Sequence, residues 1–331
     1  FLAPDEIPRA LFTEGSEIIT EVTKILAPKI DSDTNERIAN LDVENAMAEL
    51  ADYSLVELEA EAFSCHRLLQ AISLDRLNLD ERKQWGQIAL KLLNTYTPKK
   101  PSDVRTWPIW NRLQPHVGIL LKNIGDDSND AAAVLMSLFA NFLKGKALYS
   151  EAEPLNRRAL AIGEKNLGPE HPKVALRLNN LASLLLDTER LAEAEPLFRR
   201  SLAIDEKNNG PEHPEVSREL NNLASLFQVT NRRSEAEPLY RRALAIDEKY
   251  YGSEHPEVAI DLGNLAMLFL ITNRLSEAEP ISRRAAVIFV HSLGMEHPNT
   301  KVALEFYKKT LAAMKLSKLE IQAKLRVVMG Q

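Results

Sequence analysis

Cysteine, glycine and long apolar runs are all scarce in this sequence. A single cysteine, Cys65, among 331 residues excludes a disulfide framework and a cysteine-based zinc site. Glycine occurs only 12 times, which argues against a β protein built on glycine turns and favours helices. The densest apolar run, Met267–Ile271, is far shorter than the roughly 18 residues of a membrane-spanning helix. Because no apolar signal segment opens the chain, we expect a cytoplasmic, mainly α-helical protein without a membrane segment.

Acidic residues gather in the first part of the chain. Residues 1–130 carry 14 Lys and Arg against 22 Asp and Glu, a net charge of −8, whereas the whole chain carries −6. No segment offers the broad basic surface that duplex DNA binding needs, so we expect no DNA partner. The chain begins with Phe1 rather than Met, and we expect it to be a piece of a longer protein.

A period of 42 residues organises the second half. Three motifs share this period, which is the signature of a repeat architecture. Glu-Ala-Glu-Pro stands at 151–154, 193–196, 235–238 and 277–280, and Glu-His-Pro stands at 170–172, 212–214, 254–256 and 296–298. Asn-Asn-Leu-Ala-Ser-Leu stands at 179–184 and 221–226.

Each unit reads as two helices. Apolar residues at three- and four-residue spacing predict a helix A from about Pro172 to Leu186. A short polar turn leads to a helix B from about Leu191 to Asn208, which Gly210 and the following proline end.

Two helices joined by a short turn, with small residues at their contact, resemble the tetratricopeptide repeat. The repeated Asn-Asn-Leu-Ala, Glu-Ala-Glu-Pro, Arg-Arg-Ala-Leu-Ala-Ile and Glu-His-Pro motifs resemble its kinesin-light-chain subclass. The resemblance covers residues 130–300. It implies a right-handed α-solenoid of about four repeats over residues 130–297, the first one degenerate, and a C-terminal capping helix over 298–331.

Charged pairs recur on helix B. Glu195 stands four residues before Arg199, a favourable helical pair, and the same pair recurs as Glu153–Arg157, Glu237–Arg241 and Glu279–Arg283. We expect these pairs, and the double arginines that contain them, to lie on a solvated convex face.

Helix A lines the concave face of such an array. Asparagine suits an extended peptide because its amide both donates and accepts hydrogen bonds, and groove asparagines hold target peptides in the families that this array resembles. The expected groove residues are Asn141, Asn179, Asn180, Ser183, Arg218, Asn221, Asn222, Ser225, Asn264 and Met267. Alternatively, one asparagine of each pair caps a loop or packs between repeats, above all Asn180, Asn222 and Asn264.

One histidine stands in each inter-repeat loop, at positions 171, 213, 255 and 297. The four are too far apart to share an ion, so we predict loop packing and no metal site.

Residues 1–80 do not repeat. Short helices at 4–12 and 42–50, a β-hairpin of 53–56 with 62–65, and a helix from 66 to about 77 predict a small winged-helix-like α+β domain. Two further helices, 81–95 and 105–124, form a helical linker over 81–129.

The pieces Phe1–Pro8, Tyr53–Val56, Phe63–Gln70 and Thr106–Pro108 resemble the region after the nucleotide-binding domain of NB-ARC-type signal-transduction (STAND) NTPases. Bacterial members place tetratricopeptide repeats directly afterwards. In that family a Met-His-Asp histidine contacts the β-phosphate of bound ADP. His66, in Cys-His-Arg, takes its place, so the resemblance implies nucleotide sensing by His66 together with the absent domain. Alternatively, His66 caps or packs the hairpin.

The chain lacks the motifs of catalysis. Its one Gly-Lys, Gly145-Lys146, is followed by Ala147 rather than Ser or Thr, so we expect no ADP or ATP bound by this chain and no other cofactor. Cys65 beside His66 makes no credible nucleophilic pair. We therefore predict a non-enzymatic sensor fragment. Its repeats bind a protein or peptide, and its winged-helix region relays binding to the intramolecular nucleotide-binding domain. The alternatives are a plain peptide-binding adaptor and, less favoured because of the acidic first part, a DNA-binding regulator.

Overall fold

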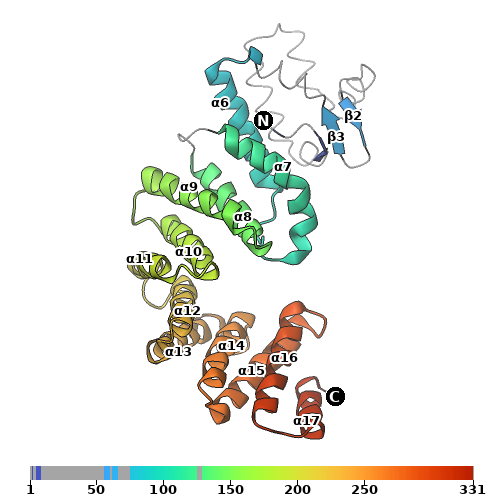
Figure 1. Cartoon of the computed structure of the whole chain (residues 1–331), viewed down its shortest axis with the longest axis vertical. Helices are drawn as coiled ribbons and strands as arrows, with labels where there is room; N and C mark the ends of the chain where they lie inside the picture. Colours follow the sequence, from blue (N-terminus) through green and yellow to red (C-terminus); the bar gives the residue numbers. More distant parts are fainter. Residues whose placement is uncertain are drawn as a thin grey trace. The chain divides into compact units, whose positions relative to one another are not determined.

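The computed structural model describes residues 2, 5–8, 56–59, 62–65, 75–124 and 129–330. The chain divides into two compact units, residues 1–169 and 170–331, which we describe separately. Both are built mainly from helices, as the periodicity predicts (Figure 1).

The described part of the first unit combines a small sheet with the long helices α6 to α9. Its elements are β1 (Ile7–Pro8), β2 (Val56–Leu58), β3 (Ala62–Cys65), α6 (Leu79–Tyr96), the 3-10 turn η2 (Val104–Thr106), α7 (Trp107–Asn123), α8 (Asp130–Gly145) and α9 (Tyr149–Leu167). The second unit consists of α10 (Pro172–Asp187), α11 (Leu191–Asn209), α12 (Pro214–Val229), α13 (Arg233–Tyr251), α14 (Pro256–Ile271), α15 (Leu275–Leu293), α16 (Pro298–Ala313) and α17 (Lys318–Val328).

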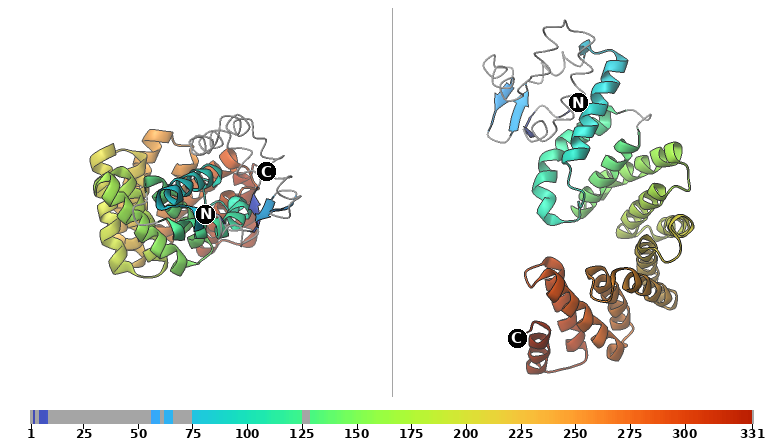
Figure 2. Two further views of the ribbon diagram at one scale, coloured as in Figure 1. Left: turned by 90° about the horizontal axis from the view of Figure 1, so that it is seen from above. Right: turned by 180° about the vertical axis from the view of Figure 1, so that it is seen from behind.

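The expected helix bounds are confirmed to within one or two residues. Helix A of the first complete repeat, α10, starts at Pro172, where a missing N–H costs nothing. Helix B, α11, ends against Gly210, whose φ of +88° suits glycine. The same pattern gives α12 with α13 and α14 with α15, each pair in contact along its length (Figure 2).

Small residues allow the two helices of a repeat to approach closely. Ala182 and Ala194 are fully buried, and the Ser201 hydroxyl donates to the Ala175 carbonyl at 2.7 Å. The next repeat uses Ser217, whose hydroxyl donates to the Ala243 carbonyl at 3.2 Å. Apolar side chains from neighbouring repeats fill the remaining space, so that the core continues along the array.

The turn between helices A and B requires a left-handed residue in every repeat. φ is close to +60° at Ala147, Glu189, Asn231, Asn273 and Lys315, which stand 42 residues apart. The sequence motifs gave no sign of this position, because four different residue types occupy it.

The helical linker packs around aromatic side chains. Trp110 on α7 is fully buried and stacks on Phe139 and Phe142 of α8, with ring centroids 6.2 and 5.4 Å away. Trp107 meets Phe142 edge-on and donates from Nε1 to the Pro101 carbonyl at 3.1 Å. The expected helices at 81–95 and 105–124 are thus present as α6 and α7.

The sheet differs from the expected hairpin. β2 pairs antiparallel with β3, with Glu57 opposite Ser64, so the strand extends to Leu58, two residues beyond the expected end at Val56. The other residues of the expected strand, 53–55, lie outside the described residues. A third strand that we did not expect, β1, pairs on the other side of β3 and gives the order β1-β3-β2. The expected helix at 4–12 is contradicted where it is described, because Ile7 and Pro8 form the strand β1 and pair with β3. The rest of that segment, the expected helix at 42–50 and most of the one from 66 lie outside the described residues.

The C-terminal segment contains two helices where we expected one. Both α16 and α17 contact α15. The buried Tyr307 donates to Glu279 Oε1 at 2.9 Å, and Lys324 on α17 donates to the same oxygen at 3.0 Å. In the part of the chain that the structure describes, no helix is both long and apolar enough to cross a membrane.

Candidate functional site

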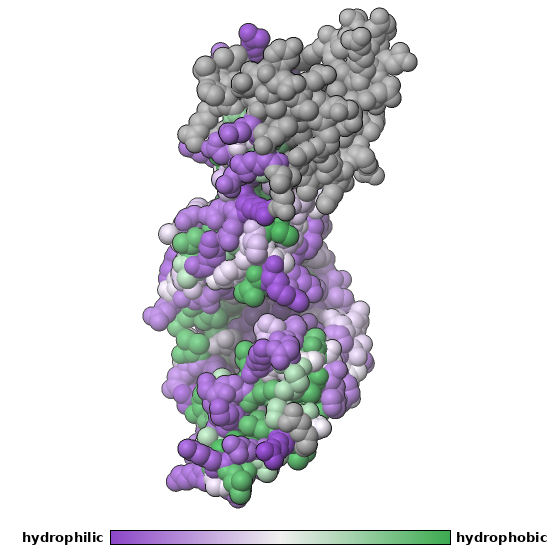
Figure 3. Space-filling model, turned by 90° about the vertical axis from the view of Figure 1, so that its right-hand side faces the viewer, coloured by the Kyte–Doolittle hydropathy of each residue, from purple (hydrophilic) through white to green (hydrophobic). Residues whose placement is uncertain are grey.

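Helix A exposes apolar side chains that its packing does not need. In residues 172–293, all of which the structure describes, five large aliphatic side chains are exposed, and all lie on α10, α12 or α14: Leu176, Val229, Ile260, Met267 and Ile271. On the face of the second unit that Figure 3 draws, hydrophobic and hydrophilic side chains alternate rather than forming one large patch.

The paired asparagines bond to one another across repeats. Asn222 donates from Nδ2 to Asn179 Oδ1 at 2.8 Å, and Asn264 donates in the same way to Asn221 at 3.3 Å. Asn179 is only 5% exposed, whereas Asn221 is half-buried. These contacts agree with the alternative prediction that Asn222 and Asn264 pack between repeats. Asn179 is too buried to offer much surface to a ligand. Each amide has further hydrogen-bonding capacity, so these contacts orient the asparagines without using them up.

The remaining expected groove residues are partly accessible. Asn141 on α8 belongs to the first unit and is half-buried. On α10 and α12, Asn180, Ser183 and Ser225 are half-buried too, and Met267 on α14 is exposed.

A pocket of about 340 Å³ lies between α12 and α14. The end of α13 also contributes to it. Its lining contains the expected residues Arg218, Asn221, Asn222 and Asn264, and also Pro214, Glu215, Asp247, Tyr251, Glu257, Ile260 and Asp261. The structure therefore brings four of the predicted residues together at one site.

The sequence reasoning missed the acidic residues of this region. Asp261 is 1% exposed and accepts a hydrogen bond from Asn221 Nδ2 at 2.6 Å. Burial raises the pKa of Asp261, and the neighbouring carboxylate of Asp247 raises it further. Burial likewise raises the pKa of Asp247. The sequence did contain a signal for Asp247 and Asp261, because helical spacing places each of these acids on the inward face of its helix.

The repeated histidines cap helices. His171 Nδ1 accepts the backbone N–H of Lys173 at 3.1 Å, and the other three histidines do the same one repeat apart. Loop packing was thus a correct but incomplete prediction. Among the described residues no group of three or more His, Cys, Asp or Glu could hold a metal ion.

The arginines of helix B make more hydrogen bonds and ion pairs than we expected. The predicted pairs Glu153–Arg157, Glu195–Arg199 and Glu237–Arg241 are present. The second arginine of the double arginines, however, bonds to neighbouring segments: Arg242 to the Pro211 carbonyl and Arg284 to that of Ser253, each at 3.0 Å. These side chains join neighbouring segments while about 40% of each side chain stays exposed, so the arginines lie at a solvated surface, as expected, and also hold the array together.

Arg232 links two repeats at the turn before α13. It pairs with Glu195 of the preceding helix B at 2.8 Å and with Glu235 at 2.8 Å. Its guanidinium also lies 4.0 Å from the centre of the Phe227 ring. Arg274 repeats the arrangement with Glu237, Glu277 and Phe269.

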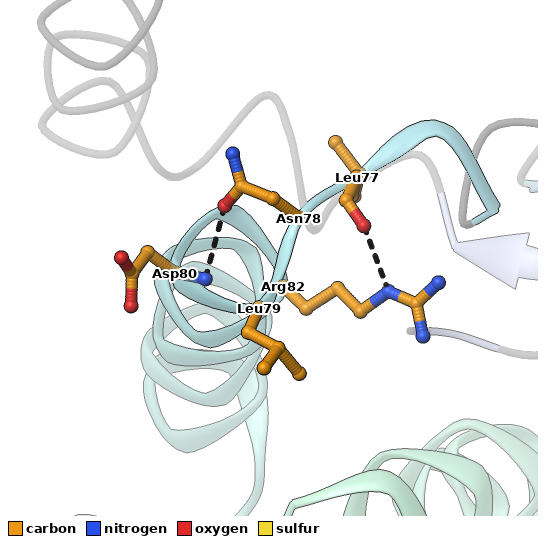
Figure 4. A pocket seen from close by; sticks show the side chains of 5 residues that line it. All are labelled: Leu77, Asn78, Leu79, Asp80 and Arg82. Atoms are coloured by element: carbon orange, nitrogen blue, oxygen red, sulfur yellow. Dashed lines mark hydrogen bonds between the residues drawn. The ribbon is translucent and has the colours of Figure 1, made fainter.

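The predicted nucleotide-sensing residue, His66, lies outside the described residues. Its neighbour Cys65 is on β3, and burial raises the pKa of its thiol, which disfavours the reactive thiolate. A second, open pocket of about 560 Å³ adjoins the start of α6. Figure 4 shows Asn78 capping this helix through the Asp80 N–H and Arg82 donating to the Leu77 carbonyl, so its polar groups serve the helix end.

Comparisons with known proteins agree with this geometry. The tetratricopeptide repeat family profile matches residues 130–207, 174–249 and 218–288. A crystal structure of a kinesin-light-chain protein of nearly identical TPR-like repeats from Podosopora anserina is 25% identical, over 59% of this chain and 92% of that one, with a TM-score of 0.50. BtubC (BKLC) from P. vanneervenii is 21% identical, over 73% and 89%, with a TM-score of 0.51.

More distant likeness shows the fold alone. The apo form of RapI is 11% identical, over 94% of this chain and 76% of that one, with a TM-score of 0.53. No curated protein sequence matches the chain. Residues 130–288 are thus tetratricopeptide repeats, and kinesin-light-chain-type repeats are among their structural neighbours.

Proposed function

We propose that this chain is a non-catalytic binding protein whose helix A surfaces hold a peptide segment of a partner protein. The distribution of exposed aliphatic side chains in the second unit carries the proposal. The exposed aliphatic side chains lie on α10, α12 and α14, next to half-buried amides and hydroxyls, whereas the exposed aromatic side chains Tyr250 and Tyr251 lie at the end of α13. Helix B instead carries arginine–glutamate clamps that join the repeats.

Binding of a peptide can be tested with the full chain and a library of random peptides displayed on phage. The test variant, Met267→Ser with Ile271→Asp, installs the residues that the first complete repeat has at the same positions, Ser183 and Asp187. Both apolar side chains are exposed, so the fold should persist. We expect enriched peptides to bind the variant about tenfold more weakly, because apolar anchors dominate such contacts.

The matched control is Arg283→Ala, which removes an exposed side chain of helix B on α15. It should leave the affinity unchanged. Failure to enrich any peptide would contradict peptide binding itself. Equal loss in both variants would contradict the placement on helix A.

We further propose that the chain is the sensor part of an NB-ARC-type NTPase, in which the winged-helix-like region of residues 1–80 relays ligand binding to a nucleotide-binding domain. The pairing of β2 with β3 supports this proposal, because a small antiparallel hairpin is expected there. ADP would be held by the other domain. Its test is His66→Asp in the intact protein, which should release ADP. Unchanged ADP retention would favour the alternative, an adaptor without a switch.

A further inference from the structure

Two buried acid pairs occupy the same place in successive repeats. Asp205 and Glu219 form the first pair, and Asp247 and Asp261 form the second, each member 42 residues after its equivalent. All four side chains are at most 6% exposed. One oxygen of each of the four carboxyls has no hydrogen-bond partner among the described residues. Such groups cost stability unless a cation or a donor compensates them.

The first pair has a cation of its own. Arg218 Nη2 lies 3.3 Å from Glu219 Oε1, and its charge acts on Asp205 as well. The same guanidinium pairs with Glu215. Arg218 is therefore committed to acids that surround it on α12.

The second pair has an isoleucine where the first has this arginine. Ile260 on α14 stands 42 residues after Arg218 and is 41% exposed. Besides Asn221, the groups that act most strongly on Asp261 are two acids. The charge of Asp247 and the hydrogen bond between the two carboxyls raise the pKa of Asp261, and so does the charge of Glu257. The repeat therefore keeps the acids but loses the cation that accompanies them one unit earlier.

The pocket between α12 and α14 opens at this second pair. Asp247 and Asp261 line it, together with Glu215, Glu257 and the ring of Tyr251. One face of that ring stacks on His255 at 4.4 Å between centroids. Its lining therefore combines four carboxyls, one already paired arginine, an aromatic ring and the exposed aliphatic Ile260.

We propose that this pocket binds the side chain of a lysine or arginine in the peptide ligand. The side chain's methylene stem would pack on Ile260 while its charged head reaches the unpaired oxygens of Asp247 and Asp261. Tyr251 adds an aromatic surface that attracts a cation. The inference rests on the proposed peptide binding and names the class of peptide.

The first test selects phage-displayed random peptides on the full chain. Enriched sequences should share a lysine or arginine at one position. Replacing that residue by norleucine in the synthetic peptide, which keeps the stem and removes the charge, should weaken binding about 30-fold or more, as expected for a buried charged contact.

Asp247→Asn should give a comparable loss for the basic peptide and none for its norleucine form. The matched control is Asp205→Asn, which neutralises the equivalent acid of the first pair, outside the pocket lining, and should leave binding unchanged. Circular dichroism and unfolding midpoints would check that both variants are folded.

The substitution Ile260→Arg gives the chain its own cation at the place where the basic side chain of the ligand would bind. We expect it to abolish the preference for a basic residue, whereas Ile260→Met, similar in length but uncharged, should keep it. Peptides enriched without a basic residue would overturn this inference and leave peptide binding intact, whereas no enrichment would contradict both. Spermidine or free arginine binding as tightly as the peptide would overturn the assignment to a peptide side chain.

Discussion

Glu219 shows how a single residue ties the stability of the array to pH. It is fully buried on α12, and burial raises the pKa of its carboxyl from 4.5 to about 7, against the opposing effect of Arg218. A raised folded-state pKa means that the folded state holds the proton more tightly than the unfolded state. This contribution to stability is therefore complete below about pH 4.5 and is lost as the pH rises through 7.

We expect Glu219→Gln to remove most of this dependence. Between about pH 5 and pH 8 the wild type should lose on the order of 3 kcal/mol of unfolding free energy more than the variant does. Urea unfolding at the two pH values measures the difference. Glu254→Gln, an exposed substitution in the next loop, serves as the control and should follow the wild type. Identical slopes for Glu219→Gln and the wild type would contradict the argument.

The asparagines show what sequence reasoning could and could not reach at this scale. Helical spacing placed Asn179 and Asn222 near the groove, and the possibility of inter-repeat packing was recognised. The bond itself joins residues 43 apart, from the second asparagine of one pair to the first of the preceding pair. A period of 42 says nothing about such an offset contact, because it depends on how far one helix A is rotated against the next.

At the scale of the element, the helices were the most predictable part of the molecule. Prolines and glycines mark both ends of each repeat, so α10 and α11 match their expected bounds closely. The turn between them was not predictable in the same way. Its left-handed position is held by hydrogen bonds such as that from the Glu189 N–H to the Leu186 carbonyl at 3.1 Å, and no residue type marks it.

Glycine at this left-handed position should stabilise the turn. Glu189 is exposed and has φ +59°, a conformation that costs side chains with a Cβ about 1–2 kcal/mol. After the entropy lost by glycine on folding, Glu189→Gly should gain about 0.5–1 kcal/mol. Asn231→Gly is the matched control one repeat later, and should gain little because asparagine already tolerates this region. Denaturant midpoints compare the two, and equal shifts would contradict the explanation.

At the scale of the whole molecule, prediction was good where the chain repeats and poor where it stops repeating. The third strand, β1, pairs with a strand far along the chain, and the carbonyl of Glu6 next to it lies 3.1 Å from His116 Nε2 on α7. Such contacts have no periodic signal. We likewise predicted one C-terminal helix where there are two, because the repeat pattern fades after Pro298 and only local helix propensity remains as a signal.

We predict that the last two helices serve as the cap that an open array needs. A cluster of Ala286, Tyr307, Leu311 and Val328 closes the end of the second unit. Ile321 and Leu325 of α17 pack against the cluster, and Val328, which is 2% exposed, is the member that this helix contributes. Its neighbour Val327 is 74% exposed. Only one of two adjacent valines is therefore needed to hold the cap in place.

We expect Val328→Asp to detach α17, because the variant would otherwise bury an unpaired charge. Unfolding free energy should fall by about 2–4 kcal/mol, and amides of residues 318–328 should exchange rapidly with solvent. Val327→Asp adds the same charge to an exposed site on the same helix and should change neither quantity. If both variants behaved alike, α17 would be an appendage rather than a cap, and the array would end at α16.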